Sequence, residues 1–282
     1  MASRDSSLIE RVLLTIESLS AFEAAAQGEG DMSERIAVIS DIHGNSVALQ
    51  AVLKEIAREG ITRTVCLGDV VGYGPDPCEC LRMVADHCEF TVRGNHEDAI
   101  LKPAQKSNFN TNARHAIEWT SKQLGSSEHR IIANMPNWFH LSRDVVCVHD
   151  SPVPIEDPGY IRNASEAAPV LNAMSEKLCL FGHTHVPAVF QMPVGRRFIR
   201  SGTLRVKNGE GTSLPSDSKF LLNPGSVGQP RDGDVRASWA VLDLDCMTFT
   251  LRRTRYEISA VREAIQSAGL PSVLGKRLAV GA

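Results

Sequence analysis

Short apolar runs alternate with helical patterns along most of this sequence, and that alternation limits the folds open to the chain. Residues 36–39 are all apolar, and residues 49–56 repeat apolar side chains at helical spacing. Further runs rich in apolar or β-branched residues follow at 64–67, 145–148 and 178–181. Alternating strands and helices are typical of layered cores, and strands that are apolar throughout are usually covered on both faces. The pattern therefore predicts sheets layered with helices.

The chain divides into an appended N-terminal segment and one large domain. Residues 8–26 have the pattern of an amphipathic helix, so we expect residues 1–34 to form an appended helix and linker. This helix either packs as a structural element or lays its apolar face into a groove of a partner. Residues 35–282 would form the main domain, with residues 99–140 as a helical cap insertion.

The last third of the sequence alternates strand patterns with polar loops. We expect a strand at 196–201, a long polar loop at 202–219, a strand pair within 238–256 and a closing helix near 258–267.

Composition excludes several classes of function. The net charge of -3 and the lack of a dense basic run argue against binding to a nucleic-acid backbone. No apolar run reaches the 18 or so residues of a membrane span, and the first residues lack the pattern of a secretory signal. Cys66, Cys147 and Cys179 lie inside apolar runs, as reduced thiols often do. We expect a cytoplasmic protein, and the sequence gives no indication of its oligomeric state.

Three cysteines and a histidine near residue 80 could be interpreted as a zinc site. Cys78, Cys80, His87 and Cys88 are close in sequence, but they lack the two-residue gap usual between paired zinc-binding cysteines. Packing of an ordinary helix over 77–87 is the better interpretation.

Five predicted strands each end in side chains that can bind a metal ion. A single Asp or His after a strand is usually a turn residue, a helix cap or a satisfied polar group. Five such endings in one chain are hard to obtain from turn preferences, and the carboxyl ends of strands are where ligands gather in open α/β sheets. The sequence therefore predicts one shared metal site, built from Asp41, His43, Asp69, Asn95, His96, His149, His183 and His185.

The types of side chain narrow the choice of metal. Carboxylate, amide and imidazole donors suit Mn above all in our interpretation, and also Fe, Zn or Ni. No thiolate belongs to the set, which argues against a closed structural zinc site. The donors outnumber the needs of one ion, so two divalent ions are predicted.

The order of these motifs resembles a known family. Asp41-x-His43, "GD" at 68–69, "GNHE" at 94–97, His149 and "GHTH" at 182–185 are similar to the five signature motifs of the calcineurin-like metallophosphoesterases. "VGYGPDP" and "NPGSVGQPRDGD" resemble the small bacterial phosphodiesterase branch of that family. The resemblance implies an α+β fold, a four-layer αββα sandwich, over residues 36–245.

The resemblance also implies a role for each ligand. Asp41, His43 and His185 would hold the first ion, and Asn95, His149 and His183 the second, with Asp69 bridging both. Two divalent ions, two carboxylates and a bridging hydroxide leave about one positive charge for an anionic ester.

The implied reaction is in-line attack of the metal-bridging hydroxide at phosphorus. His96 is the candidate acid for the leaving oxygen, oriented by Glu97 or Asp98. Arg231 is a candidate phosphate contact. Asn223 is expected near the metals, either orienting a loop or contacting the substrate.

Four further residues carry weaker expectations. Asp150 places an extra carboxylate beside His149, where the branch usually has a small residue. Trp138 and Phe139, together with Trp119, could wall the substrate cleft, although packing is the better interpretation.

A departure from the family bears on the substrate. Ser/Thr phosphoprotein phosphatases carry Asp-Arg after the second motif, whereas this chain has Gly72 and Tyr73. The missing arginine removes a planar phosphate clamp. The sequence therefore favours a phosphodiesterase acting on small or nucleotide esters. Phosphomonoester or phosphoprotein hydrolysis is the alternative, and an inactive metal-binding scaffold is the second alternative.

Overall fold

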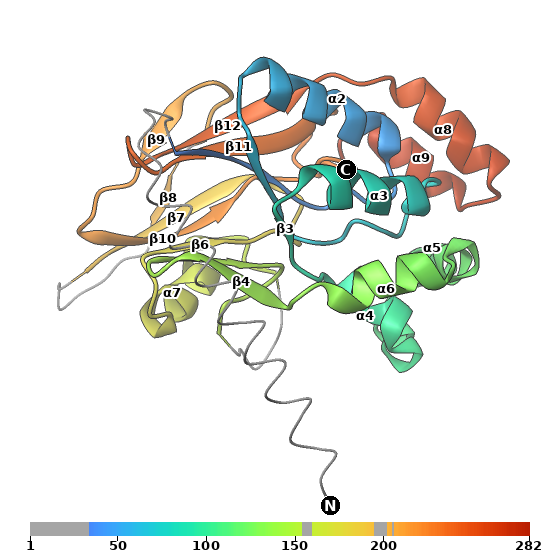
Figure 1. Cartoon of the computed structure of the whole chain (residues 1–282), viewed down its shortest axis with the longest axis horizontal. Coiled ribbons are helices and arrows are strands. Elements are labelled where there is room, and N and C mark those ends of the chain that lie inside the picture. Colours follow the sequence, from blue (N-terminus) through green and yellow to red (C-terminus); the bar gives the residue numbers. More distant parts are fainter. Residues whose placement is uncertain (1–33, 154–159, 195–201, 205) are drawn as a thin grey trace, which may run out of the picture. The chain divides into compact units, whose positions relative to one another are not determined.

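The computed structural model describes residues 34–282, apart from 154–159, 195–201 and 205 (Figure 1). The helix expected over residues 8–26 and the strand expected over 196–201 lie outside the described residues. None of the helices in the described ranges has the length and apolar character needed to cross a membrane.

Two mixed six-stranded sheets form the centre of the domain. The first runs in the order β3 (Phe90–Thr91), β2 (Arg63–Cys66), β1 (Arg35–Ile39), β11 (Ala237–Asp243), β12 (Thr248–Thr254) and β9 (Gly211–Ser213). The second runs in the order β4 (Trp138–Ser142), β5 (Val145–Val148), β6 (Leu178–Leu180), β10 (Ser218–Asn223), β7 (Ala188–Pro193) and β8 (Gly202–Leu204).

The strands that lead to the predicted ligands are parallel within each sheet. In the first sheet β1, β2 and β3 are parallel neighbours, and in the second sheet β5, β6 and β10 are. Parallel neighbours end at the same edge of a sheet, so the polar residues that follow these strands gather there.

The helices of the domain connect and cover these sheets. Their bounds are α2 (Ser46–Arg58), α3 (Pro77–His87), α4 (Asn95–Leu101), the 3₁₀ helix η1 (Pro103–Asn108), α5 (Thr111–Gln123), α6 (Ser126–Asn134), α7 (Ala164–Ala173), α8 (Ile258–Ser267) and α9 (Ser272–Leu278).

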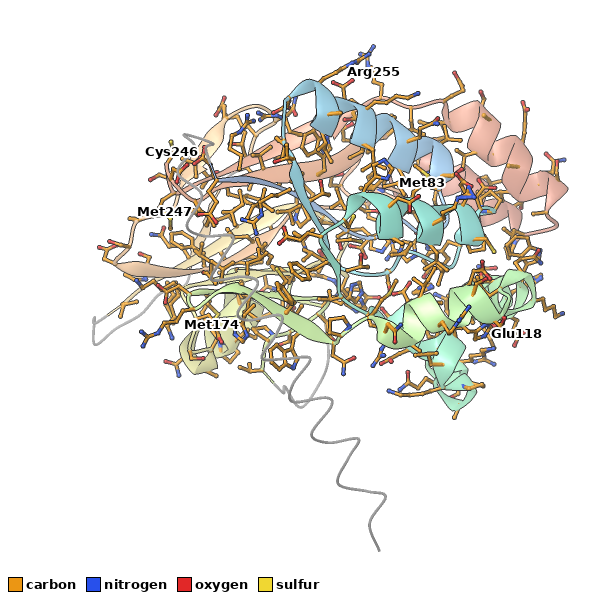
Figure 2. All side chains as sticks on the ribbon, viewed as in Figure 1. Met83, Glu118, Met174, Cys246, Met247 and Arg255 are labelled. Carbon is orange, nitrogen blue, oxygen red and sulfur yellow. The ribbon has the colours of Figure 1, made fainter. Side chains whose placement is uncertain are left out.

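Alternate residues of the strands serve different layers, as the pleat of a sheet requires. In β1, Ile36 and Val38 belong to the core between the two sheets, and Ala37 and Ile39 to the core shared with α2 and α3. A third core packs α7 on the far face of the second sheet. Side chains fill the space between these layers (Figure 2). Each fully buried Val, Leu or Ile stabilises the fold by about 1.5–3 kcal/mol. The predicted α+β, four-layer αββα sandwich is confirmed.

The boundaries of the helical insertion differ from those expected. Helical structure begins at Asn95 and ends at Asn134, so residues 138–140 belong to strand β4 instead. Trp138 lies on this edge strand and is 58% exposed, and Phe139 stacks on Phe90. Residues 138–142 form a strand because they pair with the apolar, β-branched strand β5. The local sequence of this segment does not reveal that partner.

The long polar loop expected at 202–219 also contains short strands. β8 pairs with β7 and β9 pairs with β12, each extending the edge of its sheet. The strand pair and closing helix expected near the C-terminus are confirmed as β11, β12 and α8.

The loop after β1 is locked to a loop of the second sheet. Asn45 caps α2 by accepting a hydrogen bond from the Ala48 amide at 3.0 Å, and its own amide donates to the Gly228 carbonyl at 2.9 Å. A Cβ at Gly228 would lie 1.7 Å from the Ile42 carbonyl oxygen. Only glycine allows the two loops to approach this closely.

We predict that Gly228→Ala destabilises the protein by about 3 kcal/mol, because backbone atoms must move to accommodate the methyl group. Gly60→Ala is the control. Gly60 has a φ of +68° but no atom near its Cβ position, so this variant costs only about 1–2 kcal/mol of backbone strain. Urea unfolding of the metal-free proteins measures both, and equal losses would contradict the close-approach argument.

Candidate metal centre and cavity

The predicted ligands converge where the two sheets end. Ligand atoms lie within 4.8 Å of one another in three groups, which are Asp41 with His43 and His185, Asp69 with His149 and His183, and His43 with Asp69 and His96. Asn95, the first residue of α4, lines the same cavity as Asp69. The structure therefore brings together side chains that span 145 positions of sequence.

Five of these residues have left-handed backbone conformations, which side chains other than glycine rarely adopt. The φ angles are 53° for Asp41, 50° for His43, 52° for Asp69, 66° for His183 and 60° for His185. Such strain persists only where the surroundings enforce it, and it clusters at functional sites. Here the loops after β1 and β2 enforce it together, because the amide of Asp41 donates to Gly68 and that of His43 to Asp69.

Three of the histidines are oriented by backbone carbonyls. In each case Nδ1 donates to a carbonyl oxygen, so Nε2 faces the centre and carries the lone pair whenever the ring is neutral. The pairs are His43 with Val71 at 3.1 Å, His149 with Leu67 at 2.8 Å and His185 with Gln229 at 2.7 Å.

The facing atoms fit a divalent cation. Nε2 of His43 lies 3.1 Å from Nε2 of His185, and two lone pairs that face each other need a cation between them. Two nitrogens bound at about 2.1 Å and at a right angle to one ion are about 3 Å apart. Oδ1 of Asp41 and Oδ1 of Asn95 are buried without a hydrogen-bond partner among the described residues. A metal ion bound at each position would satisfy these oxygens.

The charges of the site respond to one another. Burial raises the pKa of Asp41 to about 7. Burial also disfavours protonated His149, but the Asp69 carboxylate 3.2 Å away outweighs it and raises the pKa of His149 to about 10. In the metal-free protein His149 is thus the counter-ion of Asp69, and metal binding at this pair would release its proton.

Glu97 supports the loop of Asp69 instead of orienting His96. Its fully buried carboxylate accepts hydrogen bonds from the backbone amides of Asp69 at 2.9 Å, Val71 at 3.0 Å and Gly94 at 2.9 Å. Glu97 therefore acts on the ligand loop, and it makes no contact with the His96 ring among the described interactions.

Asp98 is also directed away from His96. It pairs with Arg93 at 2.9 Å and with Lys102 at 3.3 Å. Arg93 in turn donates to the Met135 carbonyl and to Asn137. Asp98 therefore ties α4 to the end of the helical insertion, and the expectation that it orients His96 finds no support in these contacts.

The ring of His96 lies between the metal ligands and the loop after β2. Its Nε2 is 4.0 Å from Oδ2 of Asp69, whereas its buried Nδ1 has no partner among the described residues. A Cβ at Gly72 would lie only 2.0 Å from that Nδ1. Burial lowers the pKa of His96 to about 4. The lowered pKa favours the neutral ring, and Nδ1 has no carboxylate partner among the described residues.

A cavity of about 440 Å³ opens in front of the ligands. The helical insertion forms one wall, and the loops after β2, β5 and β10 contribute further residues. The lining consists of Asp69, Tyr73, Asn95, His96, Gln105, Phe109, Asn110, Ala113, Asp150, Tyr160, His183, His185 and Arg231. Arg231 and Asp150 are therefore at the cavity, as the sequence predicts.

Arg231 is held in place by Gln229. Oε1 of Gln229 accepts hydrogen bonds from the guanidinium at 2.8 and 3.3 Å, and the Gln229 carbonyl accepts the hydrogen bond of His185. The guanidinium carbon lies 5.8 Å from the centre of the Tyr73 ring. One glutamine thus positions both a metal ligand and the cation of the cavity.

Asn223 lies behind the ligands and not in the cavity. It is fully buried, and its amide donates to the Gly182 carbonyl at 2.7 Å and to Thr184 Oγ1 at 3.1 Å. These bonds shape the loop that carries His183 and His185. These contacts agree with the interpretation of Asn223 as a loop-orienting residue, and Asn223 is not among the residues that line the cavity.

The aromatic residues of the cavity differ from the ones considered in the sequence. Trp119, Trp138 and Phe139 are not among the lining residues; Tyr73, Phe109 and Tyr160 are. Phe109 stands edge-on to His96, with ring centres 4.9 Å apart. In the sequence, the one indication that Phe109 has a special role is that it is a single aromatic residue in the otherwise polar stretch "KSNFNTN".

The cysteine group near residue 80 does not form a metal site. Cys80 is buried in the core beneath α3, Cys78 donates to the Gln123 carbonyl, and His87 bonds to the Met83 carbonyl. Clusters of metal-binding donors among the described residues do not include them. The preference for helix packing at this segment is confirmed.

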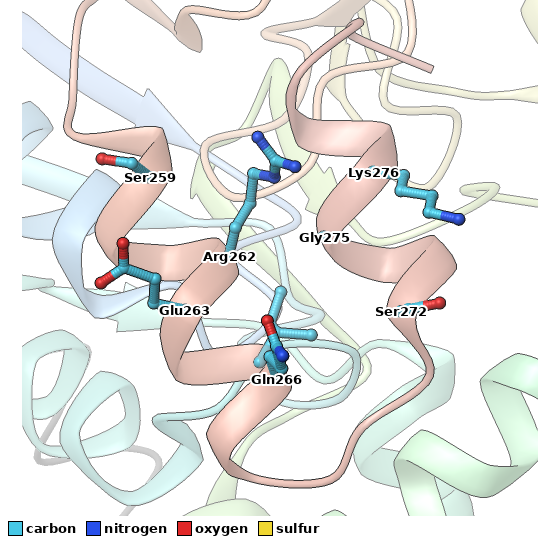
Figure 3. A pocket seen from close by; sticks show the side chains of 8 residues that line it. Ser259, Arg262, Glu263, Gln266, Ser272, Gly275 and Lys276 are labelled. Atoms are coloured by element: carbon cyan, nitrogen blue, oxygen red, sulfur yellow. The ribbon is translucent and has the colours of Figure 1, made fainter.

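A second hollow lies between α8 and α9 and shares no lining residue with the metal cavity. It measures about 520 Å³. Figure 3 shows Arg262 and Glu263 projecting from α8, and Lys276 from α9. Their charges are exposed to solvent.

Comparison with known proteins agrees with this geometry. Residues 34–187 match the family model described as calcineurin-like phosphoesterase. The crystal structure of a metallophosphoesterase from Sphaerobacter thermophilus is 36% identical, with a TM-score of 0.76, covering 89% of this chain and all of that one.

Two archaeal proteins extend the comparison. The uncharacterized protein MJ0912 of Methanocaldococcus jannaschii is 34% identical over 254 residues, which are 87% of this chain and 98% of that protein. The hypothetical protein PH1004 of Pyrococcus horikoshii shares the fold at 19% identity, with a TM-score of 0.69, covering 88% of this chain and 98% of that one. The converging ligands and the matching family model together show that this chain belongs to the calcineurin-like phosphoesterases and is a metal-dependent phosphoesterase.

Proposed function

We propose that the protein hydrolyses small phosphodiesters, including nucleotide diesters, with two divalent ions, of which Mn fits the donor set best. The observation that carries this proposal is the charge of the cavity. Arg231 is the one Lys or Arg side chain among its described lining residues, and Asp150 offsets it. The side chains around the substrate thus add little net charge. A singly charged diester suits such a cavity better than a doubly charged monoester.

The ligands would hold the ions as their positions suggest. Asp41, His43 and His185 would bind the first ion, and the group around His149 and His183 the second, with Asp69 between them. Bound there, two ions would activate a water molecule as the nucleophile and neutralise the phosphoryl oxygens.

Two protein side chains would bind the ester and protonate its leaving group. Arg231, fixed by Gln229, would bind a phosphoryl oxygen and orient the ester. His96 would donate a proton from Nε2 to the leaving oxygen. An anionic ester beside the ring raises the pKa of His96 from its low resting value, since a nearby negative charge favours the protonated form.

The backbone around Gly72 argues against the phosphoprotein-phosphatase alternative. A side chain at position 72 would collide with His96, so no Asp can stand there to pair with the ring in its present position. Tyr73, with a φ of +60°, fills the space beside His43 and His96. A scaffold without activity is disfavoured by the presence of every ligand together with His96. The burial of Cys66, Cys147 and Cys179 as free thiols supports a cytoplasmic location.

We predict that metal-free protein supplied with Mn²⁺ hydrolyses bis-p-nitrophenyl phosphate with a kcat/KM at least about tenfold above that for p-nitrophenyl phosphate. A tenfold ratio corresponds to about 1.4 kcal/mol of transition-state discrimination. Preference for the monoester would favour the phosphatase alternative. If neither ester is hydrolysed although Mn²⁺ is bound, the inactive-scaffold alternative is favoured.

His96→Ala should reduce kcat on diesters with poor, alkoxide-like leaving groups by about 10²–10⁴-fold, and on nitrophenyl esters far less. The reason is that only a poor leaving group needs a proton in the transition state. His115→Ala, at an exposed position of α5, is the control. Equal losses on both kinds of ester would show that His96 binds substrate without donating a proton.

Arg231→Met should lower kcat/KM about 10- to 100-fold, the range expected for losing a charged hydrogen bond to the phosphoryl group. Arg231→Lys should recover part of the loss, because the charge returns without the planar fork. Arg255→Met, at the exposed residue after β12 (Figure 2), is the control. An Arg231→Met enzyme with wild-type kinetics would remove Arg231 from the mechanism.

A further inference from the structure

His183 is supported differently from the other histidines of the centre. Its Nδ1 faces inward, 3.2 Å from Nε2 of His149, whereas the other three ligand histidines donate Nδ1 to a carbonyl. Its Nε2 makes no hydrogen bond with the described residues. The usual partner that fixes the ring of a metal-binding histidine is therefore missing within the described part of the chain.

An aromatic stack takes that place. The ring of Tyr160 lies parallel to the ring of His183, with centres 4.4 Å apart and planes 11° apart. The guanidinium carbon of Arg162 lies 4.2 Å from the centre of the Tyr160 ring. The Tyr160 ring therefore contacts both the ring of His183 and the guanidinium of Arg162.

The stack is anchored in the fold on its outer side. Ile161, between the two stacking residues, is 3% exposed and belongs to the core beneath α7. The backbone amide of Arg162 donates to the carboxylate of Glu166 in the first turn of α7 at 2.6 Å. The helix that covers the second sheet therefore holds Tyr160 against His183.

The geometry points to Tyr160 as the positioning residue of His183, which sets the metal affinity of the half of the centre formed with Asp69 and His149. This inference rests on the dinuclear centre proposed above. Without the stack the imidazole can rotate about its side-chain bonds, and binding an ion must then restrict that freedom. Loss of a group that supports a ligand typically weakens metal binding 10- to 100-fold. The half with Asp41, His43 and His185 has its own carbonyl supports and should be unaffected.

Titration of the metal-free protein with Mn²⁺ tests this inference without any assay of activity. Bound Mn per chain is measured by elemental analysis after dialysis at graded free Mn²⁺. Tyr160→Leu should weaken one of the two ions about 10- to 100-fold and leave the other within about threefold. Tyr160→Phe, which preserves the stack, should bind both ions within about threefold of the wild type.

Further variants locate the effect. A Tyr160→Leu, His183→Ala double variant should bind no more weakly than His183→Ala alone, because the stack acts through that ring. Arg162→Met should cause a smaller loss at the same ion, and Arg143→Met, at an exposed turn residue, should cause none. Thermal unfolding of each metal-free variant checks that it is folded, and Arg162→Met provides the test if Tyr160→Leu does not fold.

The two proposals fail in different ways. A wild-type protein that binds a single ion refutes the dinuclear centre, whatever the variants do. A Tyr160→Leu curve that overlays the wild-type curve refutes the role of Tyr160, whatever the stoichiometry. Equal weakening of both ions would also overturn it, because the damage would then be general.

Discussion

The structure depends on one unfavourable concentration of polar groups. Two carboxylates and four imidazoles are almost fully withdrawn from water at the shared end of two sheets, and a fifth imidazole, that of His183, is partly buried beside them. Burial alone opposes their charged forms, as the pKa of Asp41, raised to about 7, shows. The group becomes favourable only when cations are shared among the donors. Burial of apolar side chains in the layers behind the site offsets the free energy lost by burying these polar groups.

Loops from both sheets hold the donors in place. Ser226 donates its hydroxyl to the Asp41 carbonyl at 2.7 Å, and the amide of His183 donates to the Asp41 carboxylate at 3.1 Å. Each sheet therefore fixes ligands carried by the other. Glu97 adds a buried carboxylate that binds three backbone amides. These contacts hold the ligand residues in left-handed backbone conformations, which are strained for side chains other than glycine.

The chemistry that distinguishes this chain lies around the ligands. A glycine at position 72 lets the His96 ring approach the loop, and it leaves no room for a carboxylate partner. Gln229 joins Arg231 to His185. The helical insertion lines the cavity with an aromatic ring and amides. In the proposed mechanism these features would set which ester can enter and how its leaving group is protonated.

The sequence alone determined the central strands, the layered fold and the residues that follow those strands, because a period of two, a helical period and a polar residue after an apolar run are local signals. The edge strands β4, β8 and β9 were not evident, because each depends on a pairing partner elsewhere in the chain. The cap at Asn45 was predictable for the same reason. Only the tertiary structure decided the partners of Glu97, the stacking of Tyr160 on His183 and the place of Phe109 in the cavity wall. Each of those depends on contacts between segments far apart in the chain, such as Tyr160 with His183 or Phe109 with His96. No local pattern encodes which distant side chain will complete a contact, since that is set by how whole layers pack.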